Sequence, residues 1–268
     1  MILSSSFLAF SQKDGLYDWE AALKNLTKIR FRRADRFSLA VLCGAISCLE
    51  QNAAAKEFAL YFGTSNGSVE SVKNSQDNIF LQNQFPLPFT FINTLSSTPL
   101  FFLLQYLNAQ TTAMSIAHSQ FAFENALNLA LIDLKQKRIK RALVGVCDIW
   151  YEPLAQACQI LDHEAYEFSA WIFLQYNKRD QVRFFGEFSE LFEFVKQFNK
   201  ASFYISPNFP LDEYNKLKEV IQIRRNNVAK TITNYSAAIA CSHFAAYKMP
   251  LFYIGYDDRG GYSFININ

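Results

Sequence analysis

Apolar residues recur along the chain in two patterns, one typical of buried helices and the other of short buried strands. The clearest helix is predicted over residues 121–134, where apolar side chains occur on nearly every side. A short apolar run at residues 114–117 precedes it and predicts a buried strand, so the chain turns sharply from strand to helix between them. Further helices are predicted at residues 34–49 and 99–107, and further strands at residues 1–10, 58–62, 142–146 and 168–175.

The second half of the chain carries shorter versions of the same patterns. The turn at residues 257–261 favours a hairpin, and residues 89–92 are expected to be extended. Thr98 is expected to cap the helix that follows, with Pro99 in its first turn. Strands that alternate with buried helices predict a layered α/β fold. The predicted strands of this half are residues 182–188, 202–205, 251–256 and 262–267, and its helices are residues 190–198, 211–223 and 235–247.

The composition excludes several classes of protein. Half of the 268 residues are hydrophobic, including 27 Phe and 13 Tyr, which excludes an intrinsically disordered chain. A net charge of +2 gives no support to nucleic-acid binding. No stretch approaches the roughly 18 apolar residues of a membrane span. The N-terminus lacks the basic region of a signal peptide, so a first β-strand is expected there.

The cysteines point to a reducing compartment. They form no CxxC pair and fall mostly in apolar segments, which is typical of buried free thiols. We therefore expect a cytoplasmic protein, because disulfides are rare there. The five cysteines are Cys43, Cys48, Cys147, Cys158 and Cys241.

Two polar segments each have a structural and a functional interpretation. The basic run at residues 135–141 ends a predicted helix, where cations interact favourably with the helix dipole, but it could also bind an acidic partner. The loop at residues 63–67 contains two glycines and could hold a phosphate. Because it lacks the lysine of a P-loop and the spacing of a dinucleotide site, a structural turn is favoured.

Several segments together resemble the β-ketoacyl-acyl carrier protein (ACP) synthases of the thiolase-like superfamily, and more closely the short chain length factors grouped with them. Residues 106–120 align without gaps to the stretch that ends in the nucleophilic cysteine of that family, which places Gln120 on the cysteine. The other segments that carry the resemblance are residues 32–40 (RRADRFSLA), 62–67 (FGTSNG), 91–93 (FIN), 142–148 (ALVGVCD) and 167–173 (EFSAWIF).

The resemblance implies a thiolase-like αβαβα fold in a single domain of residues 1–268. Residues 1–176 would form the N-terminal, synthase-like half. Residues 177–268 would form a shortened C-terminal half. Residues 91–93 and the helix after them would line the interface between two subunits.

The resemblance also implies where the catalytic groups of an active synthase would lie, and this chain matches none of them. Gln120 replaces the cysteine, and residues 206–210 read Ser-Pro-Asn-Phe-Pro where a histidine loop belongs. Where the family has a K-x3-GH motif, this chain keeps the lysine as Lys230 but has Tyr235 in place of the histidine. Condensation needs a thiolate and hydrogen-bond donors to the malonyl carbonyl, so no catalysis is expected. The three histidines fall elsewhere, at His118, His163 and His243.

We therefore expect a non-catalytic subunit that pairs with an active β-ketoacyl-ACP synthase and shapes its acyl tunnel. ACP would be a transient partner, and no nucleic acid, cofactor or metal is expected. Each buried CH₂ contributes about 0.8 kcal/mol, whereas a bulky side chain at the tunnel end opposes further growth. The candidate tunnel and interface residues, spaced as if on one helix face, are Phe101, Phe102, Gln105 and Tyr106, with His118 at the junction.

Other interpretations stay open. The aromatic residues of the helix could be ordinary core, His118 a structural histidine and Gln120 a neutral filler. A second hypothesis is a malonyl-ACP decarboxylase that uses Gln120 and Lys230 to prime chains. A third is a scaffold that binds acyl chains or ACP. Within polyketide or fatty-acid-type chain elongation, the resemblance most suggests aryl-polyene-type pigment biosynthesis in Gram-negative bacteria, but no residue selects that product.

Overall fold

The computed structural model arranges the strands in two mixed sheets. It describes residues 1–11, 16–51, 57–118, 120–149, 166–198, 201–206, 208–223, 251–257 and 259–267. Sheet A contains β1 (Ile2–Ser11), β2 (Ala59–Thr64), β3 (Ala113–Ala117), β4 (Arg141–Asp148) and β5 (Tyr166–Gln175). Sheet B contains β6 (Gln181–Phe185), β7 (Ser202–Ile205), β8 (Gln222–Ile223), β9 (Leu251–Asp257) and β10 (Gly261–Ile267).

The two sheets have the same strand order and the same strand directions. Sheet A has the order β1-β5-β4-β2-β3 and sheet B the order β6-β10-β9-β7-β8. If the strands of sheet B are renumbered from 1, the two orders are identical. In both sheets the first two pairs are antiparallel and the last two are parallel. The chain therefore contains one five-stranded arrangement twice, and residues 177–268 build it with a shorter sequence than residues 1–176.

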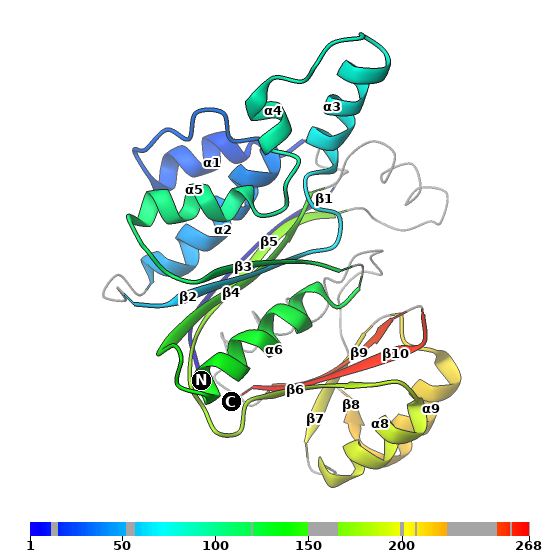
Figure 1. Ribbon diagram of the computed structural model, residues 1–268. Helices are drawn as coiled ribbons and strands as arrows, with labels where there is room; N and C mark the ends of the chain where they lie inside the picture. Colours follow the sequence, from blue (N-terminus) through cyan, green and yellow to red (C-terminus); the bar gives the residue numbers. More distant parts are fainter. Residues whose placement is uncertain are drawn as a thin grey trace.

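The helices form layers around the sheets, which confirms the predicted αβαβα arrangement (Figure 1). Helices α1, α2 and α5 cover the outer face of sheet A, α6 lies between the two sheets, and α8 and α9 cover the outer face of sheet B. Helices α3 and α4 project beyond the outer layer of sheet A. The bounds are α1 (Trp19–Leu26), α2 (Arg36–Glu50), α3 (Val69–Phe80), α4 (Pro88–Ile92), α5 (Thr98–Leu107), α6 (Ala122–Lys135), α8 (Phe188–Val195), the 3₁₀ turn η2 (Lys196–Phe198) and α9 (Leu211–Val220).

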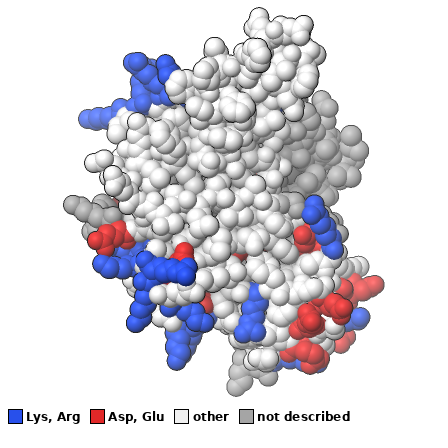
Figure 2. All heavy atoms as spheres, viewed as in Figure 1, with Lys and Arg blue, Asp and Glu red and all other residues white. Residues whose placement is uncertain are grey.

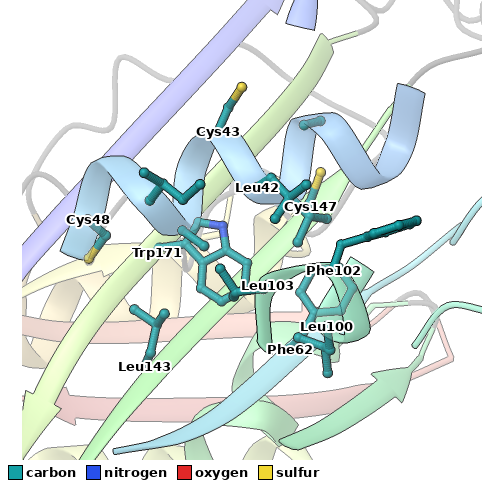
Figure 3. Packing of buried hydrophobic residues seen from close by; sticks show 14 of the residues in the cluster. Leu42, Cys43, Cys48, Phe62, Leu100, Phe102, Leu103, Leu143, Cys147 and Trp171 are labelled. Carbon is teal, nitrogen blue, oxygen red and sulfur yellow. The ribbon is translucent and has the colours of Figure 1, made fainter. Parts of the chain in front are cut away.

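The apolar core follows these layers. One cluster joins α6 to both sheets, a second packs α2 and α5 on sheet A, and a third packs α8 and α9 on sheet B. In the second cluster, the indole of Trp171 lies beneath α2 and stacks on Phe62 at 5.7 Å (Figure 3). A Cβ atom on Gly145 would lie 2.1 Å from that indole, so only glycine fits on β4 at this position.

The structure corrects the sequence-based prediction for residues 89–92, which are helical and belong to α4. The alternation of Phe89 and Phe91 imitates a strand, but Pro88 in the first turn fixes a helical φ. The prediction that Thr98 caps α5 was also wrong, because Ser97 is the N-cap residue. The hydroxyl of Thr98 instead donates to the Ile92 carbonyl at 2.6 Å.

Other differences concern the ends of elements. The predicted helix at residues 211–223 ends at Val220, and the predicted strand at 182–188 ends at Phe185 before α8 begins. Helices α1 and α3 were not predicted, because α1 has only eight residues and α3 has only four apolar residues in twelve. The predicted helix at residues 235–247 lies outside the described residues. Of the helices that the structure describes, none is long and apolar enough to cross a membrane.

Candidate functional site

The turn from β3 into α6 brings the start of this helix against sheet A. Strand β3 ends at Ala117, and α6 begins at Ala122 after one irregular turn. The helix start lies directly on β2, since a Cβ atom on Gly63 would be 2.5 Å from the Ala122 carbonyl oxygen. A glycine at residue 63 is therefore what allows the N-terminus of α6 to approach the sheet.

His118 caps this helix start. Its Nδ1 atom accepts hydrogen bonds from the backbone N–H groups of Phe121 at 3.1 Å and Gln120 at 3.4 Å. Its ring stacks on that of Phe121, and its own backbone N–H donates to the Thr64 carbonyl. By accepting these bonds, His118 positions the two residues that lead into α6, and it satisfies the N–H group of the N-cap residue Phe121.

Gln120 occupies the junction itself, and its side chain is half-buried at the positive end of α6. A primary amide cannot form the anionic nucleophile that acyl transfer requires. The described cysteines lie elsewhere, and burial raises the pKa of Cys43 and of Cys48 to about 12. Burial also raises the pKa of Cys147, which faces α2 and so lies on the side of sheet A opposite α6.

The remaining predicted catalytic positions are placed only in part. Lys230 and Tyr235 lie outside the described residues, as do His163 and His243. The segment after β7, where the resemblance places a histidine loop, is described except for residue 207. The backbone N–H of Ser206 donates to the Ile254 carbonyl, and Phe209 is buried in the core of sheet B. Within the described ranges, no three His, Cys, Asp or Glu side chains are grouped so that they could hold a metal ion.

The glycine-bearing loop after β2 is held by a buried carboxylate and is a structural turn. Asp148, at the end of β4, accepts hydrogen bonds from the Thr64 hydroxyl at 2.8 Å and from the backbone N–H groups of Ser65 and Asn66. Burial raises the pKa of Asp148, and these hydrogen bonds oppose that shift. The carboxylate therefore occupies the loop N–H groups that an external phosphate would need.

Sequence reasoning missed one buried acidic group, Glu124, in the first turn of α6. Its Oε1 accepts a hydrogen bond from the Ser263 hydroxyl of β10 at 3.4 Å, and its buried Oε2 has no partner among the described residues. Burial raises the pKa of Glu124 to about 8. The only signal was an acidic residue in an otherwise apolar helix, and there it resembles an ordinary charge at a helix N-terminus.

A large apolar surface is exposed over α3, α4 and the loop between them, and we call it the α3–α4 surface. Phe85, for example, is 96% exposed. On the face shown in Figure 2, the top right of the view is uncharged, and lysine and arginine side chains gather at the upper left. One cation borders the surface, since the Arg33 guanidinium lies over the Phe89 ring at 4.0 Å. Exposed apolar area of this extent is typical of a surface that another protein covers. It consists of Ile79, Phe80, Leu81, Phe85, Leu87, Phe89, Phe91, Ile92 and Leu95.

An open sheet edge accompanies this surface. Strand β3 is the last strand of sheet A and pairs only with β2 in the described structure. Its Met114 side chain is exposed. The Ser115 hydroxyl donates to the carbonyl and the hydroxyl oxygens of Ser96, in the connection that follows α4. An edge strand offers unpaired backbone N–H and C=O groups to a further strand.

The four candidate tunnel residues of α5 do not share one face. Phe101 is 63% exposed and Gln105, one turn later, is exposed beside it. Phe102 is only 9% exposed and packs edge-on against Phe31, as Tyr106 does at a tilt. The expectation of a single face was therefore wrong, because i, i+4 pairs starting at adjacent residues form two rows about 100° apart.

Comparison with known proteins reveals similarity of fold. No protein family profile and no curated protein matches the sequence. A chain of the ketosynthase ApeO in complex with its chain length factor ApeC from Xenorhabdus doucetiae has 11% identity and a TM-score of 0.64, and the match covers 100% of this chain and 98% of that one.

Two other ketosynthase structures are similar to a comparable degree. The ishigamide ketosynthase/chain length factor has 13% identity and a TM-score of 0.71, over 94% of this chain and 85% of that one. The type II polyketide ketosynthase AntDE, solved with the acyl carrier protein AntF, has 11% identity and a TM-score of 0.68, over 99% and 97%. The chain therefore has the thiolase-like fold of ketosynthases and chain length factors.

Proposed function

We propose that this chain is a non-catalytic, chain-length-factor-like subunit that pairs with an active β-ketoacyl-ACP synthase. The observation that carries the proposal is Gln120 at the β3–α6 junction, where the resemblance implies a nucleophilic cysteine. The surrounding architecture is kept: Gly63 allows the close approach of the helix, and His118 caps it. An intact junction with an unreactive side chain favours a structural role beside an active subunit.

The α3–α4 surface and the edge of β3 supply the interface in this proposal. Burial of exposed apolar side chains drives association, and β3 could pair with a strand of the partner. The two features adjoin, because Ser115 of β3 bonds to Ser96 at the end of the α4 segment. The solved ketosynthase with its chain length factor supports a partner that is itself a ketosynthase.

The tunnel role falls to the exposed row of α5. Phe101 and Gln105 are accessible to a bound partner, whereas Phe102 and Tyr106 are held against Phe31 in the core. A phenyl ring at the end of a tunnel would oppose further extension by overpacking. ACP would deliver the growing chain to the active subunit.

Co-expression with an active ketosynthase of the source organism tests the proposal. We expect a stable heterodimer in size-exclusion chromatography that elongates ACP-bound chains, and no condensation by this chain alone. The Gln120→Ala variant should keep pairing and product formation. A chain that forms a stable homodimer and never binds the synthase would contradict the proposal.

The same preparations separate this function from the decarboxylase hypothesis. Carbon dioxide release from malonyl-ACP is measured with this chain alone and with Gln120→Ala. A chain-length-factor-like subunit should give no release above background in either preparation. Release that disappears in Gln120→Ala would make the chain an enzyme and overturn the non-catalytic assignment.

A further inference from the structure

A groove lies at the end of α6 farthest from Gln120. It has a volume of about 710 Å³ and is bounded by the last two turns of α6, the β5–β6 connection, η2 and strands β9 and β10. Because α6 has 14 residues, this end lies about 20 Å from the junction. The volume is in the usual range for small-molecule sites. The groove is thus separate from both the junction and the α3–α4 surface.

The groove is strongly basic. Lys135 of α6 and Lys178, Arg179 and Arg183 of the β5–β6 segment line it, and none of the four has a carboxylate partner among the described residues. The acidic lining residue, Asp180, has a buried side chain that pairs with the N-terminal ammonium of Met1 at 2.7 Å. Figure 2 shows lysine and arginine side chains gathered here, at the lower left.

This positive charge outweighs the helix dipole. The C-terminus of α6 carries roughly half a negative charge, whereas the four cationic side chains carry four positive ones. The charge of Asp180 is already compensated by the chain terminus. The groove therefore favours an anion.

The basic side chains extend from a preorganised segment. The connection turns at Asp180, whose backbone N–H donates to the Asn177 carbonyl at 3.1 Å. Buried Asn266 of β10 donates from Nδ2 to the Arg179 carbonyl at 3.2 Å. The guanidinium of Arg183 stacks over Phe194 at 4.6 Å. Side chains on a fixed turn lose less freedom on binding than those on a flexible loop.

The floor and walls are partly apolar. Five apolar side chains line the groove together with the cations: Leu131 and Ile132 of α6, Val182, Phe198 and Phe252. A small inorganic anion would leave this apolar area exposed to water, whereas an alkyl or aryl group would bury it. The lining thus combines a cationic rim with an apolar wall.

The geometry points to a binding site for an amphipathic organic anion, with a phosphate or carboxylate head against the cations and an alkyl or aryl body along the wall. Arginine suits either head group, because its guanidinium can donate two parallel hydrogen bonds. This site is independent of pairing with a synthase, and its test uses the chain alone.

Calorimetric titration at low ionic strength with octyl phosphate, octanoate, inorganic phosphate and octanol tests the site. We expect octyl phosphate to bind at least tenfold more tightly than inorganic phosphate, and octanol not to bind at matching concentration. Octanoate compared with octyl phosphate identifies the preferred head group. Octyl phosphate that binds no better than inorganic phosphate would overturn the proposal.

Two double variants locate the binding. Lys178→Gln with Arg179→Gln should weaken octyl phosphate binding at least tenfold. The matched control, Arg30→Gln with Arg32→Gln, removes the same charge from the basic segment before α2 and should change affinity less than twofold. Both pairs are exposed, so folding should be unaffected. Equal weakening by the two pairs would mean that net charge alone attracts the ligand, and would overturn the site.

Discussion

Three buried carboxyl groups, in different parts of the molecule, differ in how many hydrogen-bond and ionic partners surround them. Asp148 is surrounded by donors and fixes the loop after β2. Glu167 accepts from the indole N–H of Trp19 at 3.0 Å and pairs with Arg36, so it joins β5 to α1 and α2. Glu124 has only its own backbone N–H and the Ser263 hydroxyl, at 3.4 Å, as donors among the described residues. Since an ionised carboxylate with so little support is unstable in the interior, the folded state favours the protonated form of Glu124.

Glu124 should make the protein less stable as the pH rises. Its folded pKa of about 8 lies above its usual value of 4.5. The stability that the folded state gains by holding this proton is therefore fully present below pH 4.5 and is lost as the pH rises to 8. Relative to the wild type, Glu124→Gln should gain roughly 1.4 kcal/mol in the free energy of unfolding per pH unit across this window. Urea unfolding at pH 5, 6.5 and 8 measures this difference.

The control for this experiment is Glu190→Gln, which changes an exposed glutamate of α8. Its difference from the wild type should stay constant with pH. Asp148 and Glu167 also have raised pKa values through burial, but they titrate in both proteins and cancel in the difference. A constant difference for Glu124→Gln would show that its carboxyl group is paired or hydrated in solution.

At the scale of single elements, strong periodicity was sufficient for prediction and weak periodicity was not. The apolar pattern over residues 121–134 identified α6, and the one over residues 99–107 identified α5, each to within about one residue. Helix α4 was missed because its aromatic residues alternate while remaining exposed. The sequence also could not show which row of α5 faces the core, since Phe101 and Phe102 are chemically the same.

The two adjacent rings of α5 should therefore respond differently to truncation. Phe102→Ala should lower the free energy of unfolding by about 3–5 kcal/mol, because it leaves a cavity against Phe31 in the core on sheet A. Phe101→Ala should change stability by less than about 0.5 kcal/mol, since its ring is exposed. In the reconstituted heterodimer, mass spectrometry of the products should show longer chains with Phe101→Ala. Unchanged product lengths in an intact complex would remove Phe101 from the tunnel.

At the scale of the whole molecule, the repeated strand order of sheets A and B was invisible in the sequence. Local patterns determine where strands lie, but strand order depends on pairing between residues more than a hundred positions apart, such as β1 with β5. The junction between β3 and α6 that contains Gln120 was predictable, because the strand and helix around it have strong patterns. The α3–α4 surface was not predictable, since an exposed apolar residue and one in the core give the same sequence pattern.

Two leucines with almost equal exposure test whether the α3–α4 surface binds the partner. Leu87, in this surface, is 73% exposed, and Leu211, at the start of α9 on the far side of sheet B, is 72% exposed. Leu87→Gln should weaken the heterodimer at least tenfold, because it places a polar amide in an apolar interface, whereas Leu211→Gln should leave its affinity unchanged. Neither should alter the free energy of unfolding of the isolated chain by more than about 0.5 kcal/mol. Affinity is measured by titrating each variant against the immobilised synthase. Equal affinities for the two variants would place the interface elsewhere, and the exposed rings of α3 and α4 would then need another occupant.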